Sequence, residues 1–160
     1  MTNSRGARDG AQVRDSPTTV IGAARRRLAL AGLPSPAGRA REFTVRALAD
    51  WSWSPAAAGV DADVAGDVVL VVAELVANAA RHGGGPSELV LDASAHRLRI
   101  EVGDRDPLPP APRRSHHPAL PGGHGLFIVE RVTDRWGVER HGRGKTVWAE
   151  VDVKRLVPGD

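Results

Sequence analysis

The sequence predicts an α/β fold, a two-layer sandwich in which helices pack on one face of a mixed or antiparallel sheet. Three features predict it. An alanine- and valine-rich run over residues 61–82 has the length and composition of a buried helix. Short segments with alternating apolar residues follow it, and a glycine-rich turn near residue 123 then leads into a second apolar run. At 160 residues and 41% hydrophobic content, the chain fits one domain with a sizeable core.

The N-terminal part is expected to hold a tail, an edge strand and a helix. Residues 1–20 are polar and have no hydrophobic period, so we expect a disordered tail followed by a folded domain over residues 21–160. The short apolar segment 28–31 is typical of an edge strand. An amphipathic helix is expected over residues 36–50, with Ser35 as its N-cap and a proline at its first position.

The central helix, residues 61–82, is expected to end at the glycines of residues 83–85. Alternating segments then predict strands over residues 88–93 and 98–104, joined by a short turn. The proline-rich stretch 107–123 reads as a loop. Beyond it we expect a helix and two strands, over residues 126–132, 135–140 and 146–153.

Composition argues against several classes of protein. The chain has no cysteine, so a disulfide or a thiolate metal site is excluded. There is no apolar run long enough to cross a membrane and no signal-peptide pattern, and we expect a cytoplasmic protein without a membrane partner. The formal net charge is only +3, and the clustered arginines lack interleaved aromatic residues, so direct nucleic-acid binding is not expected.

The most informative segment is Glu-Leu-Val-Ala-Asn-Ala-Ala-Arg-His at residues 74–82. Glu74, Asn78 and His82 are spaced i, i+4 and i+8, so on a helix they share one stripe. A carboxylate and a carboxamide among apolar residues are costly to bury without partners. Either both groups face solvent, or a ligand or metal satisfies them.

Two further motifs point to a nucleotide. The glycine-rich turn at Gly123 and Gly125 precedes a predicted helix, and the free N–H groups at a helix start suit phosphate. Alternatively, the loop needs these glycines only to form its turns. Asp104 ends an alternating strand, where a carboxylate can accept a hydrogen bond from an exocyclic amine such as that of adenine, or simply form a turn. Farther along, Gly144 lies in a tight turn before the last strand.

In this order, over roughly residues 38–153, the motifs resemble the nucleotide-binding fold shared by gyrase, histidine kinases and the heat-shock chaperone ATPases, the GHKL or Bergerat fold. Within it the chain is most similar to the anti-sigma-factor serine/threonine kinases and to actinobacterial histidine-kinase-like ATP-binding regulatory proteins. The matching residues are Glu74 and Asn78 in the N box, Asp104 in the first glycine box, Gly123 and Gly125 in the second, and Gly144 and Thr146 in the closing strand.

The chain departs from the family pattern at two places. Two spaced glycines normally follow the aspartate of the first glycine box, but here Arg-Asp-Pro follows Asp104. Asp106 is an alternative to Asp104 for the contact with adenine. We prefer Asp104, because Asp104 directly follows the alternating strand. Lys145 stands where kinase members often carry threonine.

The resemblance implies a site for ATP and Mg²⁺. Asp104 would accept the adenine amine, with Thr146 nearby and contacting the base through water. Asn78 would ligate Mg²⁺, which takes an amide oxygen together with phosphates and waters. Glu74 would act as the catalytic base toward a hydroxyl group. The phosphates would lie at the glycine turn, formed by Gly123, His124, Gly125 and Leu126.

The implied function is that of an ATP-binding regulatory protein, a serine/threonine kinase of the anti-sigma-factor type that phosphorylates an antagonist protein and controls transcription. Its expected partners are that antagonist and a sigma factor, and a homodimer is left open. The alternative is a nucleotide-binding interaction module with little or no catalysis. The presence of Glu74 favours the kinase, whereas the missing glycines after Asp104 favour the module. Residues 107–123 would form the lid over the nucleotide.

Overall fold

The computed structural model describes residues 23–53, 62–82, 84–105 and 124–156. The expected tail and the expected lid loop lie outside these ranges. The described elements are β1 (Ala24–Ala29), α1 (Pro36–Asp50), α2 (Ala62–His82), β2 (Pro86–Ala93), β3 (Arg97–Asp104), α3 (His124–Val132), β4 (Arg135–His141), β5 (Gly144–Asp152) and α4 (Val153–Leu156).

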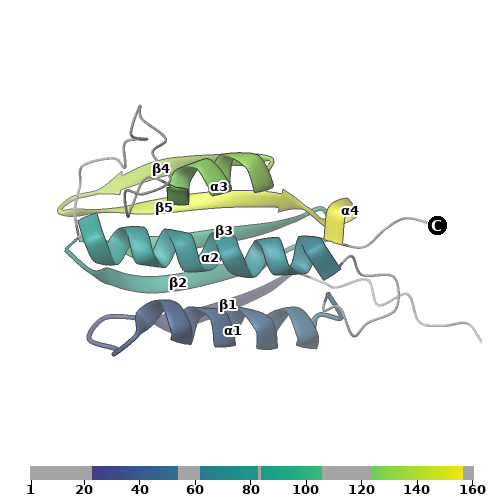
Figure 1. The fold of residues 1–160 in the computed structure, drawn as a ribbon, viewed down its shortest axis with the longest axis horizontal. Helices are drawn as coiled ribbons and strands as arrows, with labels where there is room; N and C mark the ends of the chain where they lie inside the picture. The colour runs from purple at the N-terminus through teal and green to yellow at the C-terminus, as the bar shows by residue number, and fades with distance from the viewer. Residues whose placement is uncertain (1–22, 54–61, 83, 106–123, 157–160) are drawn as a thin grey trace, which may run out of the picture.

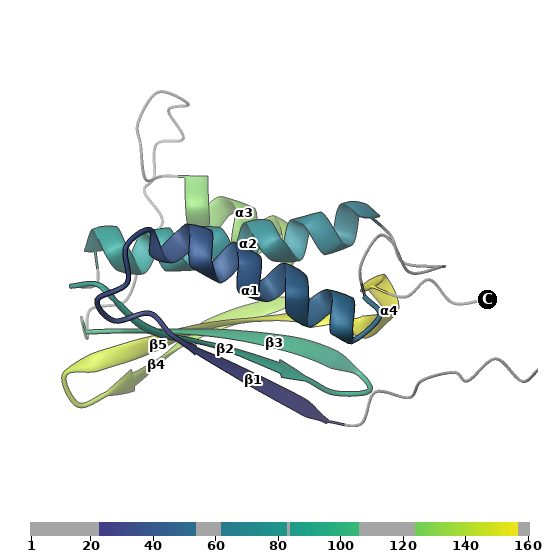
Figure 2. The same ribbon diagram turned by 90° about the horizontal axis from the view of Figure 1, so that it is seen from below.

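The strands form one five-stranded sheet in the order β1-β2-β3-β5-β4, and every neighbouring pair is antiparallel. Helices α1, α2 and α3 lie side by side on one face of the sheet (Figures 1 and 2). The predicted two-layer sandwich is therefore confirmed, and the sheet is antiparallel rather than mixed.

Helix α2 lies across the middle of the sheet and supplies much of the core. Its fully buried residues recur at helical spacing, at Val68, Val71, Val72, Leu75 and Val76. They belong to one apolar cluster with the inward side chains of β2, β3 and β5. Burying a side chain of this size contributes about 1.5–3 kcal/mol, so this stripe is a principal source of the stability that holds α2 on the sheet. No helix in the described ranges has the length and apolar character needed to cross a bilayer.

Helix α1 begins at Pro36, as predicted, but its start is not capped as expected. Ser35 has a left-handed backbone with a φ of 51°, and its side chain makes no capping hydrogen bond. The other end closes through the backbone, where the N–H of Trp53 donates to the carbonyl of Leu48 over 2.7 Å. Trp51 and Trp53 are both buried and meet edge to face, with ring centroids 5.7 Å apart. The two rings therefore anchor the end of α1 in the core.

Strand β1 begins at Ala24, several residues before the predicted segment. The prediction missed its first residues because an arginine takes one of the core-facing positions, where an apolar residue would be expected. Ala24 and Leu28 pack against the core, and Arg26 lies between them on the same side of the strand. Its guanidinium lies 5.4 Å from the ring centroid of Trp51 and 2.7 Å from the carboxylate of Asp50. Because a charged residue occupies a core-facing position, the alternation of apolar residues does not reveal the first part of this strand.

The C-terminal end also differs from the prediction. Strand β5 ends at Asp152, and residues 153–156 turn into the short helix α4 instead of extending the strand. Leu156 is fully buried, and the N–H of Val153 donates to the carbonyl of His96 over 3.0 Å. The turn thus brings one more leucine into the core.

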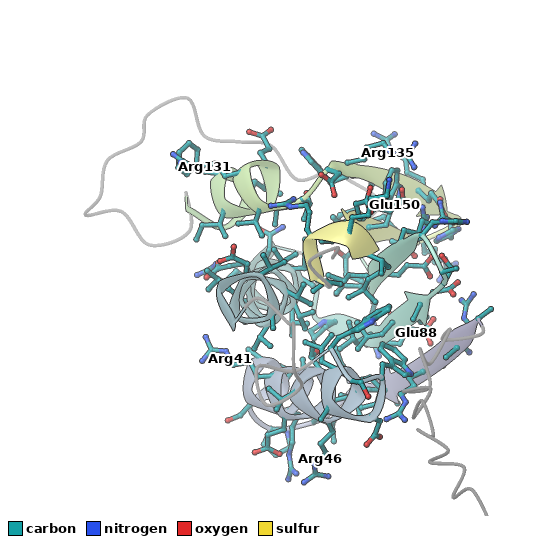
Figure 3. All side chains as sticks on the ribbon, turned by 90° about the vertical axis from the view of Figure 1, so that its right-hand side faces the viewer. Arg41, Arg46, Glu88, Arg131, Arg135 and Glu150 are labelled. Atoms are coloured by element: carbon teal, nitrogen blue, oxygen red, sulfur yellow. The ribbon has the colours of Figure 1, made fainter. Side chains whose placement is uncertain are left out.

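The sheet face opposite the helices, called here the open face, carries a network of ion pairs. Arg99 contacts the carboxylates of Glu101, Glu139 and Glu150 at 2.8, 2.8 and 3.1 Å, and its guanidinium lies 4.3 Å from the ring centroid of Trp148. Glu150 also pairs with Arg97 and Arg135. Figure 3 shows the labelled side chains of Glu150 and Arg135 on the sheet side of the molecule, away from α1. Charged groups cover this face where apolar residues cover the other.

Candidate functional site

The predicted site residues gather toward one end of the molecule. The C-terminal end of α2, the end of β3, the beginning of β5 and the beginning of α3 all lie toward the same end (left in Figure 1). Antiparallel pairing produces this arrangement, because the last residue of β3, Asp104, lies opposite Pro86 on β2 and opposite Lys145 on β5. Helix α2 ends at His82, and β2 follows Gly84 and Gly85, whose positive φ angles of 68° and 104° suit glycine.

Glu74 and Asn78 lie on α2 as predicted, four residues apart on one stripe, and both are half-buried. The stripe borders the buried residues Val71 and Leu75. Within the described residues, neither the Glu74 carboxylate nor the Asn78 amide has a hydrogen-bond or ion-pair partner. Partial burial without a partner leaves both groups available to a ligand. The side chain of His82, the third residue of the predicted stripe, lies outside the described residues.

Helix α3 begins at His124, two residues earlier than predicted, so His124 and Gly125 belong to its first turn. Its first backbone N–H groups lack partners within the helix and lie at the positive end of the helix dipole. Leu126 is buried, with 8% of its surface exposed, and holds this first turn against the core. Gly123 lies outside the described residues. The helix start therefore offers donors suited to phosphate.

Asp104 is buried at the end of β3, and its carboxylate is engaged by Lys145. The Nζ of Lys145 lies 3.0 Å from each of the two carboxylate oxygens. The side chains of Asp104 and Lys145 are only 2% and 4% exposed. A buried carboxylate needs such a partner, because water is not there to solvate its charge.

Gly144 makes the contact between β3 and the β4–β5 hairpin possible at this point. A Cβ atom at residue 144 would overlap the backbone oxygen of Asp104. A backbone oxygen held in a sheet cannot move aside as a flexible side chain can. The glycine of the predicted closing motif is therefore required for the close approach that places Lys145 beside Asp104.

Thr146 does not lie beside Asp104. Successive residues of a strand point to opposite faces, so Lys145 shares the helix-covered face with Asp104, and Thr146 points to the open face. The Thr146 hydroxyl lies 2.9 Å from the Nε2 of His141. We therefore assign Lys145, in place of Thr146, to the position next to Asp104. Alternation along the strand indicates from the sequence only that Lys145 and Val147 share a face. Which residue lies opposite Asp104 depends on the register between β3 and β5.

The residues present fit the expected groups unequally. The Asn78 amide oxygen suits a hard cation such as Mg²⁺, and the start of α3 suits phosphate. At the position expected to contact the base, the carboxylate of Asp104 is present, and the Lys145 ammonium contacts both of its oxygens. Among the described residues, the site thus combines two polar groups on α2 that have no partner with one carboxylate on β3 that is already paired.

A family model for the histidine kinase-like ATPase domain matches residues 34–151 of this chain. The chain belongs to the histidine kinase-like ATPase domain family. The match spans α1 to β5 and includes every predicted site residue. No match was found among curated proteins.

Among solved structures, this family member is similar to the crystal structure of the RsbU and RsbW domains of Rv1364c from Mycobacterium tuberculosis. The TM-score is 0.53 at 19% sequence identity, and the alignment covers 80% of this chain. The chain spans about a third of the length of that protein, 32%. At this identity the likeness establishes a shared fold.

Proposed function

We propose that this protein binds ATP and Mg²⁺ where α2, β3 and α3 meet, and that it acts as a serine/threonine kinase of the anti-sigma-factor type on a regulatory protein. The observation that carries the proposal is the pair of Glu74 and Asn78. They are half-buried, lie one helical turn apart and have no partner among the described residues. Membership in the histidine kinase-like ATPase domain family supports a nucleotide as the ligand.

Each residue has a distinct part in this proposal. Asn78 would hold Mg²⁺ through its amide oxygen, and the residues at the glycine turn, Gly123, His124, Gly125 and Leu126, would hold the phosphates through the backbone. Glu74 would orient the incoming serine or threonine hydroxyl and accept its proton as the new oxygen–phosphorus bond forms. When bound, ATP supplies the phosphoryl group that is transferred.

The proposed protein partners are an antagonist of an anti-sigma factor, as the phosphorylated substrate, and a sigma factor. The support is the resemblance of the motifs to anti-sigma-factor kinases, together with the shared fold with a protein that contains RsbU and RsbW domains.

A second candidate is a nucleotide-binding interaction module with little or no catalysis. The Asp104–Lys145 pair favours it, because the carboxylate that would read the base is already engaged. In this case nucleotide binding would change the shape offered to a protein partner, and Glu74 would have no chemical part.

Two measurements test the proposal and separate the candidates. Calorimetry with ATP, with and without Mg²⁺, measures binding, and transfer of labelled phosphate to candidate antagonist proteins measures catalysis. Mg²⁺-dependent binding with transfer supports the kinase, and binding without transfer supports the module. No heat at millimolar nucleotide would contradict both.

A further inference from the structure

Lys145 is an unusual residue in this chain. Of the 22 lysine and arginine residues only Lys145 and Lys154 are lysines, so nearly every other cation is an arginine. Lys154 is exposed on α4, whereas the Lys145 side chain is only 4% exposed. The open face shows that this protein ordinarily pairs its carboxylates with arginine, as Arg99 and Glu150 do. A single ammonium group buried at the candidate site therefore calls for a separate explanation.

The geometry of the pair determines what a ligand would meet. The Nζ of Lys145 lies 3.0 Å from each of the two carboxylate oxygens of Asp104, so it contacts both of them. An amine that approached the same carboxylate would compete with this ammonium for the same oxygens. Since both side chains are almost completely buried, water can screen their attraction only weakly.

Replacing the Lys145 ammonium by the amine of a base would weaken the contact with the Asp104 carboxylate. The present contact joins two full charges, so its Coulomb attraction exceeds that of a neutral donor on the same carboxylate. The amine of a base is neutral, and so is a ring nitrogen of the base, so contacts with the base would not replace the attraction between the ammonium and the carboxylate. Displacement of Lys145 thus opposes binding of the base, and the remaining free energy must come from the phosphates and the metal.

We propose that Lys145 sets the nucleotide affinity of this site by holding Asp104, so that a purine base binds only by displacing the Lys145 ammonium from the carboxylate. This inference rests on the proposed nucleotide function, and it identifies Lys145 as the residue that weakens recognition of the base. It predicts that the protein responds to nucleotide at higher concentration than the same site would without the lysine.

The test is calorimetry of Mg²⁺–ATP binding to the full chain and to substituted forms. Lys145→Thr removes the ammonium, and Lys145→Gln replaces it by a neutral amide that still donates to Asp104, which protects the fold if the threonine form is unstable. Both are expected to bind ATP at least about tenfold more tightly, since the base no longer has to break an ion pair to reach Asp104. Lys145→Arg keeps a cation on Asp104 and should retain the low affinity.

Two controls make the result specific to the base. Lys154→Thr removes the other lysine, which is exposed on α4, and should leave ATP affinity unchanged. Mg²⁺–tripolyphosphate carries the phosphates without a base, so its affinity should not increase in Lys145→Thr or Lys145→Gln. A parallel increase for tripolyphosphate would overturn the proposal, because Lys145 would then be acting on the phosphates.

The outcomes separate this inference from the proposed function. If the unsubstituted protein binds ATP and both neutral forms, still folded by thermal melting, bind it equally or more weakly, the inference is wrong and the proposed function stands. Absence of ATP binding in every form would overturn both. Binding by the neutral forms alone would support the inference and overturn the proposed function, because Lys145 would then keep the unsubstituted site closed to nucleotide.

Discussion

The two faces of strands β3 and β5 carry the two principal sets of ion pairs in the described residues, and they differ in kind. On the helix-covered face the Lys145 ammonium contacts the Asp104 carboxylate, and both side chains are almost completely buried. On the open face, Glu150 is shared by Arg97, Arg99 and Arg135, and two of these arginine side chains are at least half-exposed. One set holds a single acceptor that a ligand could take over, and the other distributes charge across the sheet. Proximity of opposite charges alone therefore does not distinguish a binding group from a structural one.

The electrostatics of Glu150 follow from this sharing. Burial by itself would raise the pKa of its carboxyl group, but hydrogen bonds from Arg99 and Arg135 and the nearby charges of Arg97 and Arg135 outweigh burial and lower that pKa. For Arg99, burial would lower the pKa of the guanidinium, and the hydrogen bonds to Glu101 and Glu150 raise it instead. The charged forms of both residues are therefore favoured by folding.

The comparison predicts that substitutions at the α2 stripe alter function, while those on the open face alter stability. The largest effect is expected for Glu74→Ala. Loss of a general base should slow phosphate transfer by about a hundredfold or more, with ATP binding retained. Alanine also favours the helix, so the melting temperature should change little. Transfer rates at saturating ATP measure the effect, and equal rates in the two proteins would remove Glu74 from the chemistry.

On the open face, Glu150→Ala should lower the free energy of unfolding by about 2 kcal/mol, because Arg97, Arg99 and Arg135 then lose their shared carboxylate. This figure is less than for a fully buried pair, since the arginines reach solvent. Urea unfolding measures it. ATP affinity should not change, and a large loss of affinity would show that the two faces are coupled.

Asn78→Ala should weaken Mg²⁺–ATP binding by about tenfold, equivalent to about 1.4 kcal/mol, because one metal ligand is lost. Binding measured without Mg²⁺ should change much less, and this difference separates a metal ligand from a structural residue. An affinity for Mg²⁺–ATP equal to that of the unsubstituted protein would contradict the metal assignment.

The smallest effect is expected in the pH dependence of stability. The Glu150 pKa is lowered by folding, so its stabilising contribution is complete above the pKa of the unfolded chain and is lost as pH falls through the folded value. The difference in unfolding free energy between the unsubstituted protein and Glu150→Gln should therefore shrink as the pH is lowered below about 4.5, the ordinary value for glutamate. A difference that stays constant down to pH about 3 would contradict the lowered pKa.

Much of the fold could be predicted because local signals agreed with the tertiary structure. The apolar run and the glycines after it delimited α2 to within one residue at its start. The alternation of Leu98, Ile100 and Val102 placed β3 and its terminal Asp104. The predicted start of β1 lies several residues after the actual start, because Arg26 occupies a core-facing position through its stacking on Trp51. That stacking partner lies on a helix end far along the chain, which no local pattern reveals.

For the candidate site, the sequence by itself determined that Glu74 and Asn78 share a stripe, because four residues make about one helical turn in any α-helix. It also determined that Asp104 ends a strand. Only the tertiary structure decided what faces Asp104. That depends on the register between β3 and β5 and on the close approach at Gly144, which together put Lys145 on the helix-covered face and Thr146 on the open one. A shift of one residue would exchange the two, because side chains alternate along a strand, and so the partner of the buried carboxylate is a property of the assembled sheet.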